Sequence, residues 1–207
     1  MENSSRNKLL SGLSIQTVIT VSTAVLQIVI FSIFSRLLGR EEFGYYAAIT
    51  GVVSILSSIS DAGIGSSLIQ KKNVTDLYRS TAFSLSLTFG MIAALINLCL
   101  SPVISELIAD KTIITPLRLL SVSIIMYSLH GYFVSSLRKE LKFKTVGICK
   151  LMSYTIASGV GIVLAYKNVG LYSLVIMTLL DSVLYMIFLL SKSKLSTLGF
   201  SINDAKK

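Results

Sequence analysis

The sequence predicts an all-α membrane protein built as a bundle of six transmembrane helices. Of the 207 residues, 53% are hydrophobic and only 14% are charged, whereas a soluble domain carries charge on about 25% of its residues. The apolar residues are gathered into six long runs, each near the roughly 20 residues that a spanning helix needs. The strands of a membrane β-barrel would instead alternate polar and apolar residues over about ten positions. These runs do not alternate in that way.

The apolar runs give the order and the expected bounds of the six helices. We expect one lobe over residues 1–191, followed by a basic cytoplasmic tail at 192–207, with helices over about 9–35, 43–65, 80–105, 117–137, 146–166 and 168–191. The first run follows Arg6 and Lys8, as the apolar part of a signal peptide does. It is too long for a signal peptide and has no small-residue cleavage site, so we expect it to be retained. The second begins after a charged turn and ends among the glycines that follow Asp61.

Charged residues also bound the later runs. The third and fourth runs contain no charged residue between residues 80 and 105 and between residues 119 and 137. The fifth run is the shortest, and it reaches spanning length only if the Lys150 ammonium group extends from its end to the membrane interface. Asp181 is the one charged residue inside the sixth run.

Lysine and arginine are distributed unevenly between the two ends of this bundle. Of the 19 Lys and Arg residues, five fall on one side, and the other fourteen fall on the side of both termini. The five are Arg36, Arg40, Lys111, Arg118 and Lys167. Because cytoplasmic loops carry the excess of positive charge, both termini are predicted to be cytoplasmic. The cations lie at the ends of apolar runs rather than in a stripe with aromatic residues, so no nucleic-acid partner is expected.

Polar residues recur at helical spacing along three of the expected helices. They are Gln16, Thr20, Thr23 and Gln27 on the first, Thr50, Ser54, Ser57 and Asp61 on the second, and Thr178, Asp181, Ser182 and Tyr185 on the sixth. Residues three and four positions apart share one helix face. Three such faces indicate a shared, water-filled interior, and the alternative is a dry bundle with hydrogen bonds between helices. Glutamines and acids favour the cavity, because they are costly in lipid.

Three titratable residues are candidates for a role inside the membrane. Asp181 is expected near the middle of the bilayer, where it needs a partner, a proton or water; it could couple transport to a proton or cation, or form a structural ion pair. Asp61 is expected at the cytoplasmic end of its helix, as a gating or an interfacial residue. His130 is the single histidine, and it could relay protons or be a packed, hydrogen-bonded residue.

Five basic residues, Arg79, Arg138, Lys139, Lys142 and Lys150, are expected to form a collar at the cytoplasmic mouth, and all but Lys139 are candidates for attracting a diphosphate. Such a collar would attract a diphosphate or anionic lipid head groups, although positive-inside topology predicts the same residues. Arg36, at the outer end of the first helix, could pair with Glu41 or Glu42 or face a central cavity. The motifs of metal centres, nucleotide-binding loops and hydrolases do not occur, so neither a catalytic function nor a cofactor is expected.

Three stretches resemble a known family of membrane proteins. RLLGREEFGYY at 36–46, DAGIG at 61–65 with IQKK at 69–72, and LRKELKFK at 137–144 are similar to segments of Wzx-type polysaccharide flippases. These are lipid-linked oligosaccharide exporters of the multidrug/oligosaccharidyl-lipid/polysaccharide (MOP) superfamily, and the likeness is to the branch of the colanic acid exporter. That family often has Pro where this chain has Arg40. The resemblance covers nearly the whole chain, but only the first lobe of the family.

The resemblance implies a function and a set of partners. It implies the N-terminal half of a transporter of the bacterial inner membrane, which flips undecaprenyl-diphosphate-linked oligosaccharide for surface polysaccharide, including lipopolysaccharide. It also implies that Arg36 faces the central cavity. The expected partners are membrane lipid, the lipid-linked oligosaccharide, and a second six-helix lobe or a second copy of this chain. The alternatives are half of a drug or cation antiporter of the same superfamily, and a non-transporting subunit or inactive fragment.

Overall fold

The computed structural model describes residues 2–61, 76–108 and 110–193, and every structural statement below concerns these residues. They form helices α1 (Glu2–Leu37), α2 (Arg40–Asp61), α4 (Asp76–Ile108), α5 (Ile114–Leu119), α6 (Ser121–Lys139), α7 (Phe143–Tyr166) and α8 (Leu171–Lys192), with a short 3-10 helix at Lys111–Ile113. The expected end of the second helix at 62–65 and the tail from residue 194 onward lie outside this part of the chain. Six helical segments of it are long and apolar enough to cross a membrane, which confirms the predicted fold class.

The fourth spanning segment is more divided than the sequence suggested. It covers Lys111–Lys139, but it consists of the 3-10 helix, α5 and α6, with a break at Leu120. Its start is set by Asp110, whose carboxylate accepts a hydrogen bond from the Thr112 amide at 2.8 Å. That hydrogen bond holds the pKa of the Asp110 carboxyl below its usual value, because it stabilises the ionised form.

The turn between α7 and α8 explains why the last helix begins at Leu171 rather than at 168. Asn168 and Gly170 have positive φ angles of 57° and 65°, a conformation that glycine, and to a lesser degree asparagine, adopts at low cost. A helix cannot continue through these residues. A Cβ atom at Gly170 would also collide with the Glu42 carboxylate at the start of α2, so this turn packs directly on the turn between α1 and α2.

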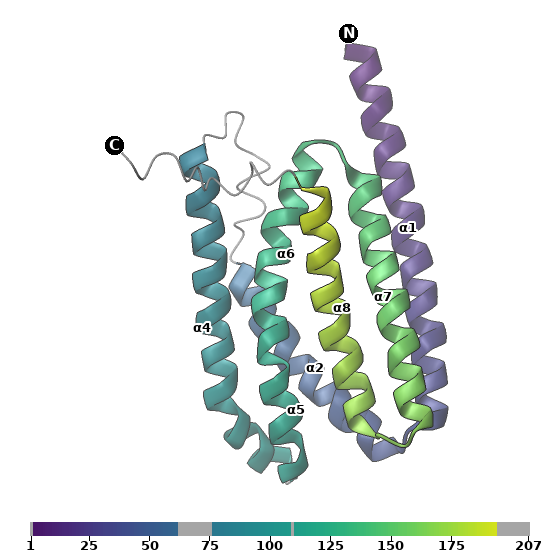
Figure 1. Cartoon of the computed structure of the whole chain (residues 1–207), viewed down its shortest axis with the longest axis vertical. Coiled ribbons are helices and arrows are strands. Elements are labelled where there is room, and N and C mark those ends of the chain that lie inside the picture. Colours follow the sequence, from purple (N-terminus) through teal and green to yellow (C-terminus); the bar gives the residue numbers. More distant parts are fainter. Residues whose placement is uncertain (1, 62–75, 109, 194–207) are drawn as a thin grey trace.

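Five of the long helices stand in a row, and the sixth crosses behind them. The order across the row is α1, α7, α8, α6 and α4, and α2 runs obliquely behind α8 and α6 (Figure 1). The start of α1 and the end of α8 lie at the top of this view, and the α1–α2 and α7–α8 turns lie at the bottom. The first two helices diverge from their shared turn, where the Phe31 ring meets those of Phe43 and Tyr46.

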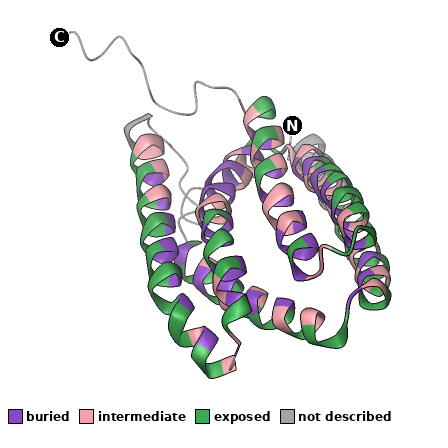
Figure 2. Cartoon of the chain, turned by 60° about the horizontal axis from the view of Figure 1, so that its bottom comes forward, coloured by how far each residue is buried: buried purple, intermediate pink, exposed green. Residues whose placement is uncertain are grey.

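Small residues allow the helices of the row to pack closely. A Cβ atom added to Gly161 of α7 would lie 2.8 Å from the Met177 Cβ of α8 and 3.1 Å from the Phe34 ring of α1. One added to Gly90 of α4 would lie 2.9 Å from the Ser128 Cβ of α6. Glycine and serine at such contacts are typical of helices that associate within a membrane. Exposed residues follow the outer faces of α1 and α4 (Figure 2), and many of them are large and apolar, as expected of surfaces that meet lipid.

Candidate functional site

Three cavities follow one another between α1 and α2. The first, of about 250 Å³, lies against α1 and is lined by Gln16, Thr20, Thr23, Gln27, Arg138, Gly147, Lys150 and Tyr185 together with three apolar residues. The second, of about 490 Å³, lies against α2 and is lined mainly by Tyr46, Thr50, Ser54, Ser57, Ser58, Asp61, Tyr127 and Thr178. The third, of about 170 Å³, lies between them. We call the lining of these three cavities the polar groove.

The third cavity connects the other two. It shares Gln27 and Lys150 with the first cavity, and Tyr46, Tyr127 and Thr178 with the second. The polar groove is therefore a continuous band of amide, hydroxyl and charged groups from α1 to α2. The polar stripes of α1 and α2 both face it, and α8 contributes Thr178 and Asp181.

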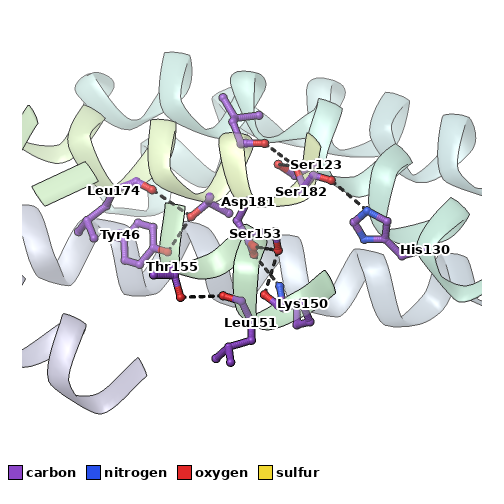
Figure 3. A network of polar contacts seen from close by, with 12 residues as sticks. Tyr46, Ser123, His130, Lys150, Leu151, Ser153, Thr155, Leu174, Asp181 and Ser182 are labelled. Atoms are coloured by element: carbon purple, nitrogen blue, oxygen red, sulfur yellow. Dashed lines mark hydrogen bonds and ion pairs between the residues drawn. The ribbon is translucent and has the colours of Figure 1, made fainter. Parts of the chain in front are cut away.

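A hydrogen bond joins the two sides of the groove near the third cavity. The Thr178 hydroxyl donates to the Leu174 carbonyl at 3.0 Å, which uses its single proton. The Tyr46 hydroxyl, 2.8 Å away, must therefore donate to the Thr178 oxygen (Figure 3). This bond holds the buried ring of Tyr46 on α2 against the middle of α8.

The charged centre of the groove is an ion pair between α7 and α8. The Lys150 ammonium donates to Asp181 Oδ2 at 2.6 Å. The Ser153 hydroxyl lies 3.0 Å from the Lys150 carbonyl and 2.8 Å from Asp181 Oδ1, and its one proton goes to the closer, charged oxygen (Figure 3). Lys150 also lies 5.2 Å from the centre of the Tyr185 ring. Asp181 is 6% exposed, and its carboxylate has a partner on each oxygen. The predicted need of Asp181 for a partner is met by this lysine.

The position of Lys150 differs from the sequence-based expectation. We expected it at the cytoplasmic end of its helix, but α7 begins at Phe143. Lys150 is thus about two turns, or roughly 10 Å, inside the helix. The expected helix over 146–166 put Lys150 in its first turn, and the structure starts the helix three residues earlier. A lysine with a buried carboxylate partner can lie within a spanning helix.

His130 packs behind the groove and lines none of its three cavities. Its Nε2 donates to the Ser182 carbonyl at 3.0 Å, and its ring lies 4.7 Å from the centre of the Tyr185 ring. The Ser182 hydroxyl donates to the Leu179 carbonyl, so the Ser123 hydroxyl donates to Ser182 in turn (Figure 3). These contacts fit the interpretation of His130 as a packed, hydrogen-bonded residue that joins α6 to α8.

The remaining predicted residues divide between the groove and other surfaces. Gln16, Thr20, Thr23, Gln27, Ser54, Asp61, Arg138, Lys150 and Asp181 line the groove. Arg36 is exposed in the last turn of α1, and Arg79 is half-buried near the start of α4; neither lines the groove. Lys142 pairs with Glu140 at 2.6 Å on the surface of the α6–α7 turn. The structure thus brings two of the five predicted collar residues, Arg138 and Lys150, into one cavity.

Sequence reasoning missed four aromatic members of the groove: Phe31, Tyr46, Tyr127 and Tyr154. Tyr46 lies one turn before Thr50, so the polar stripe of α2 could have been extended to it by the same four-residue spacing. Tyr154 lies one turn after Lys150 on α7, so the same four-residue spacing applied from Lys150 would have identified it.

Unsatisfied polar atoms are concentrated in the groove. Among the described residues, four buried side-chain atoms have no hydrogen-bond partner in the protein: Ser57 Oγ, Asn97 Oδ1, Arg138 Nε and Tyr154 Oη. Three of the four belong to residues that line the groove. Buried polar atoms are almost always paired with protein, water or ligand, so these three indicate that the groove holds water or a polar ligand.

Comparison with known proteins identifies the family of this chain. A family described as "Polysaccharide biosynthesis protein" matches residues 33–207. The lipopolysaccharide biosynthesis protein WzxC of Escherichia coli (strain K12) is 24% identical over 143 residues, 69% of this chain and 29% of that protein. The teichuronic acid biosynthesis protein TuaB of Bacillus subtilis (strain 168) is 23% identical over 152 residues, 73% of this chain and 32% of that protein. No solved structure matches.

The chain thus spans about a third of the length of these relatives. The family match extends over more than half of this chain and over all the described helices after α1. This multi-pass membrane protein belongs to the polysaccharide biosynthesis protein family.

Proposed function

We propose that this chain is the first lobe of a flippase that moves a lipid-linked oligosaccharide across the bacterial inner membrane. The observation that carries the proposal is the polar groove, which runs from α1 to α2 and holds three buried atoms without protein partners. Both named relatives belong by name to the biosynthesis of polysaccharide polymers. Such polymers are built from sugar units that must cross a membrane. A polar groove offers hydrogen-bond partners to the sugar hydroxyls along that path.

The groups in the groove suit an amphiphilic substrate with a polar head. Hydroxyl and amide groups such as Thr20, Gln27 and Ser54 can exchange hydrogen bonds with sugar hydroxyls, while Arg138 and Lys150 can bind the diphosphate that joins the sugar to undecaprenol. The apolar outer faces of α1 and α4 would stay in lipid with the polyprenyl tail. The groove therefore separates a path for the head from a path for the tail.

One lobe supplies only part of the wall that this substrate needs. The groove lies between two diverging helices, and a sugar head must be shielded across about 30 Å of hydrocarbon. Transporters built from repeats place their sites between two such halves, near the middle of the bilayer. We infer that a second six-helix lobe, or a second copy of this chain, closes the groove, and that the site alternates between the two membrane faces.

The ion pair argues against the alternative of a cation antiporter. A site for a transported cation needs carboxylate oxygens that are free to bind it, and both oxygens of Asp181 are already occupied by Lys150 and Ser153. Asp61 is exposed at the end of α2, where water is its natural partner. The charges that remain available in the groove near Asp181 are cationic, which favours an anionic substrate.

The orientation can be tested with an impermeant thiol reagent. In a chain whose Cys99 and Cys149 are replaced by serine, a single cysteine at Glu106 should be labelled from the periplasm, and one at Leu141 should not. The reason is that, by the Lys and Arg count of the sequence, the end of the bundle where α1 begins and α8 ends is proposed to be cytoplasmic. Labelling at Leu141 but not at Glu106 would reverse the orientation.

The transport proposal can be tested by complementation of a flippase-deficient strain. Residues 1–207 alone should leave surface polysaccharide at the background level, because half of the wall is missing. Co-expression with the second lobe of a full-length relative should restore polysaccharide. Full restoration by a demonstrably monomeric 207-residue chain would disprove the half-transporter proposal, and no restoration with any second lobe would disprove the flippase proposal.

A further inference from the structure

Two cations share the first cavity, but within the described part of the chain only Lys150 has an acidic partner. Lys150 and Arg138 both line this cavity, and Arg138 Nε is buried without a hydrogen-bond partner among the described residues. Lys150 alone also lines the third cavity, where Asp181 lies. The Lys150 side chain therefore lies at the boundary between the first cavity, which holds Arg138, and the third cavity, which holds Asp181.

The positive charge that faces the first cavity depends on the position of the Lys150 ammonium. With Lys150 on Asp181, the pair is neutral, and Arg138 leaves a single positive charge in the first cavity. If the Lys150 ammonium turned away from Asp181, two cations would face the same 250 Å³ space, with no carboxylate among the residues that line it. Two cationic donors around one space make a site for a multiply charged phosphate group.

We propose that Arg138 and Lys150 together bind the phosphate group of a lipid-linked substrate, and that Asp181 competes with this phosphate for the Lys150 ammonium. Lysine suits this exchange because its charge lies at the end of a flexible four-carbon stem. The proposal rests on the proposed function and adds its regulation: Asp181 weakens phosphate binding, and it recaptures Lys150 when the substrate leaves. Ser153 keeps Asp181 in place throughout, since its bond goes to the other carboxylate oxygen.

The competition has a measurable consequence for affinity. When Lys150 leaves Asp181, it loses a short, partly buried, charge-assisted hydrogen bond, and that loss is subtracted from phosphate binding. In Asp181→Asn the amide keeps the shape of the carboxylate but not its charge, so Lys150 is free at little cost. We expect Asp181→Asn to bind a polyprenyl diphosphate about tenfold more tightly than the unmodified chain, as removal of one such competing bond allows.

The experiment uses the full chain in nanodiscs of phosphatidylcholine, titrated with farnesyl diphosphate in a calorimeter. Asp181→Asn should lower Kd about tenfold, whereas Arg138→Gln, and Lys150→Gln combined with Asp181→Asn, should raise it at least tenfold. Lys167→Gln removes an exposed cation from the opposite end of the bundle and should leave Kd unchanged. The double variant is used because Lys150→Gln alone would leave Asp181 buried without its partner. Thermal unfolding of each variant checks that it is folded.

Two results would overturn the proposal. One is equal affinity of the unmodified chain and Asp181→Asn, and the other is a double variant that binds as tightly as Asp181→Asn. A repeat in nanodiscs of phosphatidylglycerol distinguishes the source of the phosphate: a selective diphosphate site keeps its affinity there, and a general lipid-phosphate site loses it. This experiment measures binding and not transport. If complementation fails but Asp181→Asn still binds about tenfold more tightly, the flippase proposal is rejected, and the competition between Asp181 and phosphate stands.

Discussion

Replacing Lys150 with methionine should destabilise the folded chain by about 3 kcal/mol, the low end of the range for breaking a buried ion pair. The carboxylate of Asp181 would stay 6% exposed with only the Ser153 hydroxyl as a partner. Its negative charge would then be uncompensated between α7 and α8. The low end of the range applies because Lys150 borders two cavities, and water in them can take over part of its role. Chemical unfolding in mixed micelles measures the difference.

A second ion pair provides a matched control for this prediction. Lys142 and Glu140 are joined at the same distance of 2.6 Å, but their side chains are 40% and 39% exposed. Lys142→Met should therefore cost less than about 1 kcal/mol. Replacing both Lys150 by Met and Asp181 by Leu should recover most of the stability that Lys150→Met loses, because no charge is then left buried. Equal effects of Lys150→Met and Lys142→Met would show that burial of Asp181 does not matter.

The fold was predictable because each spanning helix is visible by itself in the sequence. Apolar runs of membrane-crossing length occur six times, and each corresponds to one spanning segment. The stripe from Gln16 to Gln27 was also predictable, since spacings of three and four residues place side chains on one helix face. Such features depend only on local periodicity, and the structure places all four polar residues of that stripe in one cavity.

Which residues of different helices pair with each other could not be predicted in this way. Lys150 and Asp181 are 31 positions apart, and their pairing depends on the register in which α7 packs against α8. That register is set by tight contacts such as Gly161 against Met177, which no single-helix pattern reveals. The break at Leu120 was missed for a related reason. The Asn97 side chain of α4 donates to the Leu117 carbonyl at 2.7 Å, so a residue of another helix satisfies a backbone group next to the break.

Gln27 shows what the helix periodicity predicts and what the packing of helices adds. The sequence placed it on the polar face of α1, and the structure shows that this face is where the first and third cavities join. One side of that junction holds the cations Arg138 and Lys150, and the other leads to the hydroxyl-lined cavity along α2. In the proposed transport path, a polar head that moves between the first and third cavities passes Gln27, so we expect transport to be sensitive to the size of this side chain.

Gln27→Trp should therefore abolish transport in a strain in which this chain and a second lobe together restore surface polysaccharide. The indole ring is among the largest side chains, and it would fill the junction of cavities that measure only about 250 and 170 Å³. Gln27→Ala removes the amide but leaves the space, and it should retain partial transport. Val25→Trp places the same ring on the outer face of α1, where the native side chain is 55% exposed, and it should transport normally. Surface polysaccharide is measured at matched protein levels in the membrane. Normal transport by Gln27→Trp would mean that the substrate does not follow the groove.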